Sequence, residues 1–310
     1  MKAFSFKGIW GLLKDSFAGF SDDKVPKLGG SLAYCTIFSL APMLLVVIFL
    51  AGLFLGREAV QGSLETQIRQ FVGEGAAQQL QEIIKNASAS KKGTIPALIG
   101  FVTLIVGATA VFAEIQDSIN GIWHLKMKPK QSWTLLLKNR LLSFGIIGGI
   151  GFLLLVSLAA SAVIEGLGKS LGTMIPGISV IFLYLVSQVV TLLIVTFLFA
   201  LIFKILPAAK IKWSDAWPGA LATALLFMAG RFAISFYISK SDFGSSYGAA
   251  GSLIILLVWV YYSSLILYFG AEFTKVYATR FGSGIHPNQY AISTEETGGI
   301  TKAVTENPKR

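Results

Sequence analysis

The stretch FGSSYGAAGSLIILLVWVYYSSLILYFGA at residues 243–271 contains no Asp, Glu, Lys or Arg. A transmembrane helix needs about 20 consecutive, mainly apolar residues, because the hydrocarbon core of a bilayer is about 30 Å thick. Other uncharged runs cover 28–56, 93–113, 141–164, 170–203 and 216–230. These runs predict a chain that crosses a membrane several times.

Two of these runs must be interpreted before the spans are counted. Pro176-Gly177 divides the run at 170–203, so the helix begins near residue 178. The run at 216–230 stops at Arg231 and resumes after it, which indicates one helix that tolerates a single charge. We therefore predict an all-α integral membrane protein with six transmembrane helices. The spans are expected near 30–56, 94–119, 141–165, 178–203, 215–238 and 246–274.

The distribution of charge predicts the orientation of these spans. Only 14% of the residues are charged, whereas soluble proteins carry about 25%. The net charge of +10 would suggest nucleic-acid binding in a soluble protein, but basic loops on the cytoplasmic side explain it better in a membrane protein. Segments on the side of the two termini hold 18 lysines and arginines, and those on the other side hold 7. We expect both termini to be cytoplasmic and the protein to be a multi-pass membrane protein.

Three segments lie outside the membrane domain, which we place at 28–280. Residues 1–27 repeat apolar side chains at helical spacing and are expected to form an amphipathic helix in the headgroup plane. The alternative is a helix packed on the bundle. The 57–92 loop has helical apolar spacing and predicts a short helical extracytoplasmic segment. The tail at 281–310 is rich in Gly, Thr, Glu, Asn and Lys, a composition typical of disorder.

Ionisable residues within membrane segments are costly and are therefore candidates for function. Glu114 and Asp117 lie one turn apart near the inner end of the second span, and Asn120 follows one turn later. Glu272 ends the sixth span on the same side. These side chains are candidates for an inner gate, a proton site or a substrate site, and the alternative is an ion pair that only locks the bundle.

Arg231 lies well within the fifth span, where a permanent charge requires a partner or a water-filled cavity. Glu165, at the outer end of the third span, is the candidate partner. Pro42 predicts a kink in the first span, because proline removes a helical hydrogen bond. Small residues in spans five and six, Gly219 and Gly230 among them, predict close contact between these helices.

Motifs for catalysis are missing from this sequence. His124 and His286 are the two histidines, and no cluster has the spacing of metal ligands. There is no phosphate-binding loop of the Walker type and no convincing nucleophile with a base. We expect no catalytic residues, no metal, no cofactor and no intrinsic ATPase.

Six short segments form an ordered set of motifs. They are GGSLAYCTIFSLAP at 29–42, INGIW at 119–123, AWPGA at 216–220, YG at 247–248, WVYYS at 259–263 and GAE at 270–272. Taken in order, these segments resemble the YihY/BrkB family over roughly residues 5–280, and the resemblance implies a protein of the bacterial cytoplasmic (inner) membrane. Cys35 departs from the aromatic residue expected beside Tyr34.

The resemblance implies a six-span protein whose members have been labelled ribonuclease BN, virulence factors or candidate transporters. Our leading hypothesis is a transporter or lipid-translocating protein of the cell envelope, with membrane lipids, anionic ones included, as partners. The alternative is a non-transporting envelope scaffold or regulator that binds an envelope protein. A ribonuclease is disfavoured because metal ligands are absent from the sequence, and we expect no nucleic-acid partner.

Overall fold

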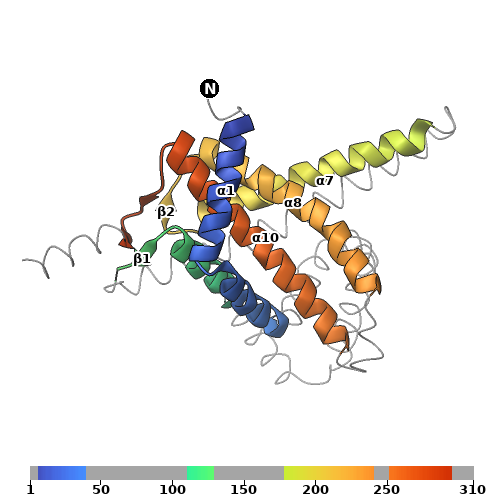
Figure 1. Cartoon of the computed structure of the whole chain (residues 1–310), viewed down its shortest axis with the longest axis horizontal. Coiled ribbons are helices and arrows are strands. Elements are labelled where there is room, and N and C mark those ends of the chain that lie inside the picture. The colour runs from blue at the N-terminus through green and yellow to red at the C-terminus, as the bar shows by residue number, and fades with distance from the viewer. Residues whose placement is uncertain (1–5, 40–109, 129–177, 241–250, 295–310) are drawn as a thin grey trace, which may run out of the picture.

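The computed structural model describes residues 6–39, 110–128, 178–240 and 251–294. Within these residues the protein is mostly helical, and three helices are long and apolar enough to cross a membrane (Figure 1). They are α7 (Ile178–Ile205), α8 (Trp213–Lys240) and α10 (Gly251–Phe281). They correspond to the fourth, fifth and sixth predicted spans. The chain is therefore a helical membrane protein.

The last helix extends beyond its predicted span, which was expected to end near residue 274. With 31 residues and a rise of 1.5 Å per residue, α10 is about 46 Å long. This length exceeds the hydrocarbon thickness of about 30 Å. We infer that the last turns of α10 extend out of the apolar layer.

The first two predicted spans are described only in part. Residues 25–39 and 110–122 are helical, in agreement with the start of the first span and the end of the second. The kink expected at Pro42, the 57–92 loop, the third span and Glu165 lie outside the described residues.

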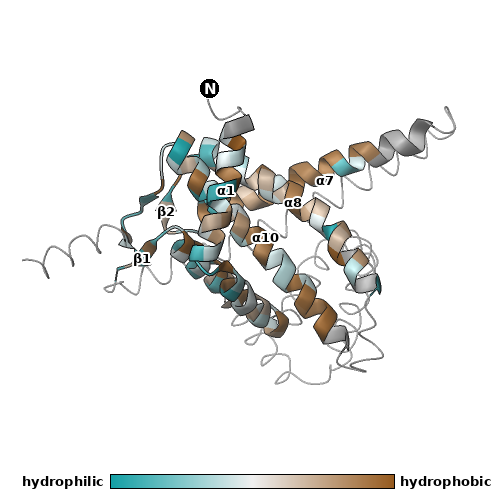
Figure 2. Cartoon of the chain, viewed as in Figure 1, coloured by the Kyte–Doolittle hydropathy of each residue, from teal (hydrophilic) through white to brown (hydrophobic). Residues whose placement is uncertain are grey.

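Apolar side chains on the outer surfaces of α7 and α8 explain why these helices need a bilayer. On α7, Leu185, Val189 and Leu193 repeat every four residues and are all more than half exposed. Comparable exposed residues on α8 are Trp213, Trp217, Leu221, Leu225, Phe232 and Phe236. Figure 2 shows that hydrophobic residues predominate along the long helices, whereas hydrophilic ones gather at the end that holds the strands. Such stripes are suited to lipid contact, because water would disfavour apolar surface of this size.

Close packing of α8 against α10 depends on two reciprocal pairs of glycine and threonine. A Cβ atom at Gly219 would collide with Thr274, and a Cβ atom at Gly270 would collide with Thr223. Each threonine donates its hydroxyl proton to the carbonyl of the glycine in its own helix, with distances of 2.6 Å for Thr223 and 2.7 Å for Thr274. A Cβ atom at Gly230 would likewise collide with the Tyr262 side chain. The predicted contact of small residues between these helices is confirmed at Gly219 and Gly230.

The N-terminal helix, α1 (Phe6–Asp22), runs alongside the last part of α10. Leu12 and Ser16 are buried, and the rings of Phe17 and Phe269 lie 4.9 Å apart. Ile9, Trp10 and Phe17 remain substantially exposed. The helix therefore packs on the bundle, as in the alternative considered above, and still presents apolar side chains outward.

Two small antiparallel sheets connect the C-terminal segment to loops between the helices. Strand β1 (Leu125–Met127) pairs with β4 (Ala291–Ser293), and β2 (Ala209–Lys210) pairs with β3 (His286–Pro287). Residues 282–294 thus differ from the disordered tail expected from composition. The physical reason is that the backbone groups of this segment find partners in both loops, which composition does not reveal. Residues 295–310 lie outside the described part of the chain.

We call one end of the bundle the basic end. It holds these strands, the start of α8 and the last turns of α10. Arg231 and Lys240 instead lie in the far half of α8. The described lysines and arginines of the basic end are Lys14, Lys24, Lys27, Lys126, Lys128, Lys204, Lys210, Lys212, Lys275 and Arg280.

Candidate functional site

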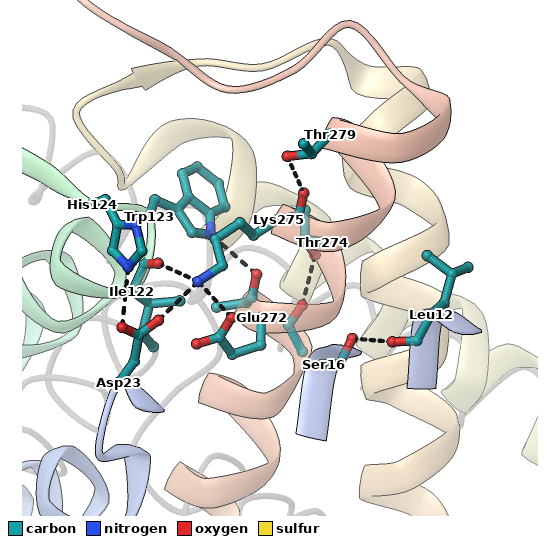
Figure 3. A network of polar contacts seen from close by, with 12 residues as sticks. Leu12, Ser16, Asp23, Ile122, Trp123, His124, Glu272, Thr274, Lys275 and Thr279 are labelled. Carbon is teal, nitrogen blue, oxygen red and sulfur yellow. Dashed lines mark hydrogen bonds and ion pairs between the residues drawn. The ribbon is translucent and has the colours of Figure 1, made fainter. Parts of the chain in front are cut away.

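Four side chains at the basic end form an ionic cluster, defined here as Asp23, His124, Glu272 and Lys275 (Figure 3). The Lys275 ammonium nitrogen lies 2.8 Å from Asp23 Oδ2 and 2.8 Å from Glu272 Oε2. His124 Nε2 lies 3.1 Å from Asp23 Oδ1. The cluster therefore joins three parts of the chain that are far apart in sequence.

The main chain supplies a further acceptor to the cluster. Lys275 donates a hydrogen bond of 2.8 Å to the carbonyl oxygen of Ile122, which ends the helix at 110–122. Carbonyls in the last turn of a helix lack an intrahelical donor and carry partial negative charge. A lysine placed there satisfies one of them and also interacts favourably with the helix dipole.

Two residues beside or within the cluster, Lys24 and His124, have backbone φ angles in the left-handed region. Lys24 has a φ of 52° and follows Asp23 in the turn after α1. His124 itself has a φ of 53° and follows the helix at 110–122. This conformation costs a residue with a Cβ atom about 1–2 kcal/mol. Both turns are thus held in place by the surrounding contacts.

Glu272 is the most buried member of the cluster, with 0% of its side chain exposed. A Cβ atom at position 19 would approach within 2.6 Å of Glu272 Oε2, so Gly19 of α1 makes room for the carboxylate. Within the described part of the chain, neither carboxylate oxygen accepts a hydrogen bond of good geometry. The close Lys275 ammonium is therefore the main compensation for burying this acid, and a buried charge without such a partner is strongly unfavourable.

Asp23 lies between the two helical segments at 6–22 and 25–39, outside the expected spans. Burial alone would raise the pKa of its carboxyl group, but the hydrogen bonds from Lys275 and His124 outweigh burial and hold the pKa below its ordinary value. Asp23 is therefore the ionised counterion of Lys275 at neutral pH.

Two hydrogen bonds brace the helix at 110–122 beside the cluster. The Trp123 indole nitrogen donates to the carbonyl oxygen of Ala271 at 3.0 Å. The Asn120 carboxamide oxygen accepts from the backbone nitrogen of Ala208 at 2.8 Å. Asn120 is 4% exposed, and it connects this helix to the loop between α7 and α8. This contact gives Asn120 a structural role, and its role as a site residue stays a prediction.

The predicted group of Glu114, Asp117 and Glu272 is only partly brought together. Glu272 meets Asp23 and Lys275, while Glu114 is half-buried and Asp117 is exposed on the helix at 110–122. The reason is position along the helix: Lys275 contacts the Ile122 carbonyl at the end of the helix at 110–122, whereas Glu114 lies eight residues earlier, about 12 Å along the axis. The centre of the site is thus Glu272 with partners from outside the predicted set.

Arg231 lies in the far half of α8 and is partly buried. Its guanidinium carbon lies 5.0 Å from the centre of the Phe232 ring, within the range of a cation–π contact. Its predicted pairing with Glu165 lies outside the described residues. Arg231 and the ionic cluster therefore occupy different parts of the bundle.

Sequence reasoning missed Asp23 and did not include Lys275 or His124 among the site candidates. The spacing of Glu272 and Lys275 was a readable signal, since residues three apart on a helix can pair. Asp23 is 252 positions from Lys275 and carried no local signal.

Asp215 is a further missed residue, which fastens the start of α8 to the C-terminal segment. It is 5% exposed and accepts hydrogen bonds from the Ser283 backbone nitrogen at 2.9 Å and the Ser283 hydroxyl at 2.7 Å. An acid in the first turn of a helix is also favoured by the helix dipole. We therefore assign Asp215 a role in fastening the C-terminal segment. Among the described residues, no group of three or more His, Cys, Asp or Glu side chains is arranged to hold a metal ion.

Comparisons with known proteins place this architecture in a family. A UPF0761 membrane protein of Tolumonas auensis is 29% identical over 284 residues, covering 88% of this chain and 83% of the relative. A UPF0761 membrane protein of Aeromonas salmonicida is 28% identical over 258 residues, with 82% and 84% covered. No solved structure matches the chain. The sequence model of the virulence factor BrkB family matches residues 16–291, and this chain belongs to that family.

Proposed function

We propose that this protein is a transporter or lipid-translocating protein of the bacterial cytoplasmic membrane, with both termini in the cytoplasm and no ATPase of its own. The observation that carries the proposal is the ionic cluster at the basic end. It contains a fully buried carboxylate, Glu272, whose charge is balanced chiefly by one lysine. Ionisable groups buried in a membrane protein are expensive to keep and mark substrate or proton pathways.

The arrangement of the cluster supports a gate at the cytoplasmic end. Lys275 joins α10 to the turn after α1 through Asp23, and to the helix at 110–122 through Ile122. Because one ammonium group serves three acceptors, a change in the charge of any acid weakens the contact between three elements at once. Protonation of Glu272 is the proposed trigger that loosens this end.

Flux measurements in proteoliposomes with fluorescently labelled anionic lipids test the proposal. We expect wild-type protein to move the lipid and Glu272→Gln to change the rate by about tenfold or more, with Lys210→Met, an exposed lysine of the same end, as the matched control. Absence of flux above protein-free liposomes would refute the transport activity. Equal flux in wild type and Glu272→Gln would refute the gate.

Arg231 is proposed as an attractor for an anionic headgroup or substrate within the bundle. The same assay with Arg231→Ala tests this role, using protein shown to be folded by its elution as a single species in detergent. We expect reduced flux because the permanent cation is lost. Flux that remains at the wild-type rate would remove Arg231 from the pathway.

An envelope scaffold is the second candidate, and the paired C-terminal segment favours it. Residues 282–294 hold both described loops of the basic end through β1–β4 and β2–β3, which suits a fixed surface. Crosslinking from the 57–92 loop distinguishes the candidates. Capture of one stoichiometric envelope protein, together with no lipid flux, would support the scaffold.

We propose further that the chain has no ribonuclease activity and needs no cofactor. Metal-dependent hydrolysis of RNA requires converging carboxylate or histidine ligands. Purified protein should leave a labelled RNA intact over hours in the presence of Mg²⁺ or Zn²⁺. Degradation that copurifies with the protein through two chromatography steps would contradict this expectation.

A further inference from the structure

An open cleft of about 480 Å³ lies at the basic end, beside the ionic cluster. Four separate parts of the chain line it, namely α1, the turn at 123–125, the last turns of α10 and the C-terminal segment. A volume of this size is typical of small-molecule sites.

Basic side chains predominate among the charged groups of the cleft. Arg280 and Lys275 line it from α10, and His124 and His286 line it from the turn and from β3. The chain has two histidines, and both line this cleft although they lie far apart in sequence. Asp15 is the acidic side chain that lines the cleft.

Lys275 and Arg280 differ in how firmly their present partners hold them. The Lys275 ammonium group donates hydrogen bonds to Asp23 and to the Ile122 carbonyl, and it also forms an ion pair with Glu272. Arg280 pairs with Asp15, and the two side chains are 43% and 38% exposed. Exposed ion pairs contribute little to stability, so a stronger anion can displace Asp15 from Arg280.

The local structure leaves room for the Arg280 guanidinium to act as a binding group. A Cβ atom at position 11 would approach within 2.9 Å of Arg280 Nη1, so Gly11 of α1 keeps this space open. A guanidinium group presents paired donors that match the oxygens of a phosphate. Arg280 is therefore the group best suited to receive such a ligand.

Apolar walls indicate that the ligand is more than a free ion. Trp123, Leu125, Val276 and Ile285 line the same cleft and suit the organic part of an ester. Because the last turns of α10 extend beyond the apolar layer, as inferred above from the helix length, the cleft lies where lipid headgroups are found. Exposed Trp10 on α1 is typical of that interface.

We propose that this cleft binds a phosphate ester, with Arg280 as the principal ligand and His286 as a second one through its Nδ1 atom, since His286 Nε2 lies 2.9 Å from the Ser283 carbonyl oxygen. The proposal deepens the transport function by naming the ligand class and a site on the cytoplasmic side, and in that respect it rests on the proposed function. Binding is measured without flux, so the two proposals can fail separately. Two sources of the ester are distinguished by the experiment, a lipid headgroup and a soluble metabolite.

The test uses the full chain in nanodiscs of phosphatidylcholine, titrated with glycerol 3-phosphate by calorimetry. A second arm adds phosphatidylglycerol to the nanodiscs and counts retained lipids by native mass spectrometry. Saturable binding in the first arm assigns a soluble ester, and selective retention in the second assigns a headgroup.

Matched variants separate a defined site from general attraction to basic surface. Arg280→Gln should weaken binding by about tenfold or more, because a charge-assisted pair is lost. Asp15→Asn should strengthen binding several-fold, because the competing carboxylate is removed. Lys14→Gln removes an exposed charge of α1 that does not line the cleft, and it should change binding by less than about twofold.

His286→Gln provides a second loss variant if Arg280→Gln does not fold. The proposal is overturned if neither arm shows binding, or if Lys14→Gln weakens binding as much as Arg280→Gln and His286→Gln do. Unchanged affinity in Asp15→Asn would likewise overturn the assignment of Arg280 as the ligand.

Discussion

The Lys275 ammonium group donates a hydrogen bond of 2.8 Å to Asp23 Oδ2, across 252 positions of the sequence. Side-chain exposures of 19% for Lys275 and 18% for Asp23 place this pair largely out of water. The pair connects the turn after α1 to α10, and Glu272 shares the same ammonium group. Stability and the proposed gate therefore depend on the same few atoms.

Replacing Lys275 by Met should destabilise the protein by about 3 kcal/mol, because two carboxyl groups then lose their common cation. Thermal unfolding in detergent, followed by circular dichroism, measures the effect. Lys210→Met, an exposed lysine of the same end, is the control and should change little. The double variant Lys275→Met/Glu272→Gln should recover part of the lost stability. If Lys275→Met lost no more stability than the control, the role of Lys275 would be contradicted.

Acidification should remove the contribution of Asp23 to the stability of the folded protein. Its pKa is lower in the folded protein than its ordinary value, which is about 3.9 in an unfolded chain. The stabilisation is therefore fully present above about pH 4 and is lost as the pH falls through the lower, folded value. Unfolding midpoints of wild type and Asp23→Asn should differ most near neutrality and converge below about pH 4.

Asp22→Asn is the control for this titration, since the side chain of Asp22 is exposed beside Asp23. The unfolding midpoint of this variant should match that of the wild type at each pH. If the difference in unfolding midpoint between wild type and Asp23→Asn grew on acidification, the predicted direction of the pH dependence would be wrong.

Substitution of Gly270 by Ala should destabilise the contact of α8 with α10 by about 1–3 kcal/mol, as overpacking does. The added methyl group would meet Thr223 of the facing helix. Adding Thr223→Gly removes the obstructing atoms and should restore part of the stability. Thermal unfolding of the single and double variants measures the coupling.

Gly121→Ala provides the matched control for this substitution. A Cβ atom at Gly121 meets nothing within 4 Å, and Ala is favoured over Gly in a helix by about 0.5–1 kcal/mol. This variant should therefore be as stable as the wild type or more so. Equal effects of Gly270→Ala and Gly121→Ala would contradict the reciprocal packing.

Lys24→Gly should stabilise the turn after α1 by up to about 1 kcal/mol, because Gly adopts a positive φ without the clash of a Cβ atom. Lys27→Gly removes the same exposed charge three residues later, within a helix, and should instead destabilise by about 1 kcal/mol. Opposite shifts of the unfolding midpoint are expected for the pair. Shifts of the same sign would show that loss of charge, rather than backbone conformation, determines the outcome.

Hydropathy along the chain is enough to predict the class of the protein and the position of its apolar helices. Runs of uncharged residues predicted α7, α8 and the main part of α10, because the exclusion of charge from a bilayer acts on each segment separately. Glycines such as Gly219 were also recognisable as contact positions, since small residues allow helices to approach.

The polar contacts, in contrast, depend on how distant segments pack in the folded protein. Glu272 was a candidate from its place at the end of a span, but Asp23, which shares the Lys275 ammonium group with it, lies in the turn after α1, 249 positions earlier in the sequence. The order of residues 282–294 likewise depends on strands supplied by distant loops. Hydropathy is a local property of the chain, whereas ion pairs and strand pairing depend on how distant segments pack, and so these features appeared only in the folded structure.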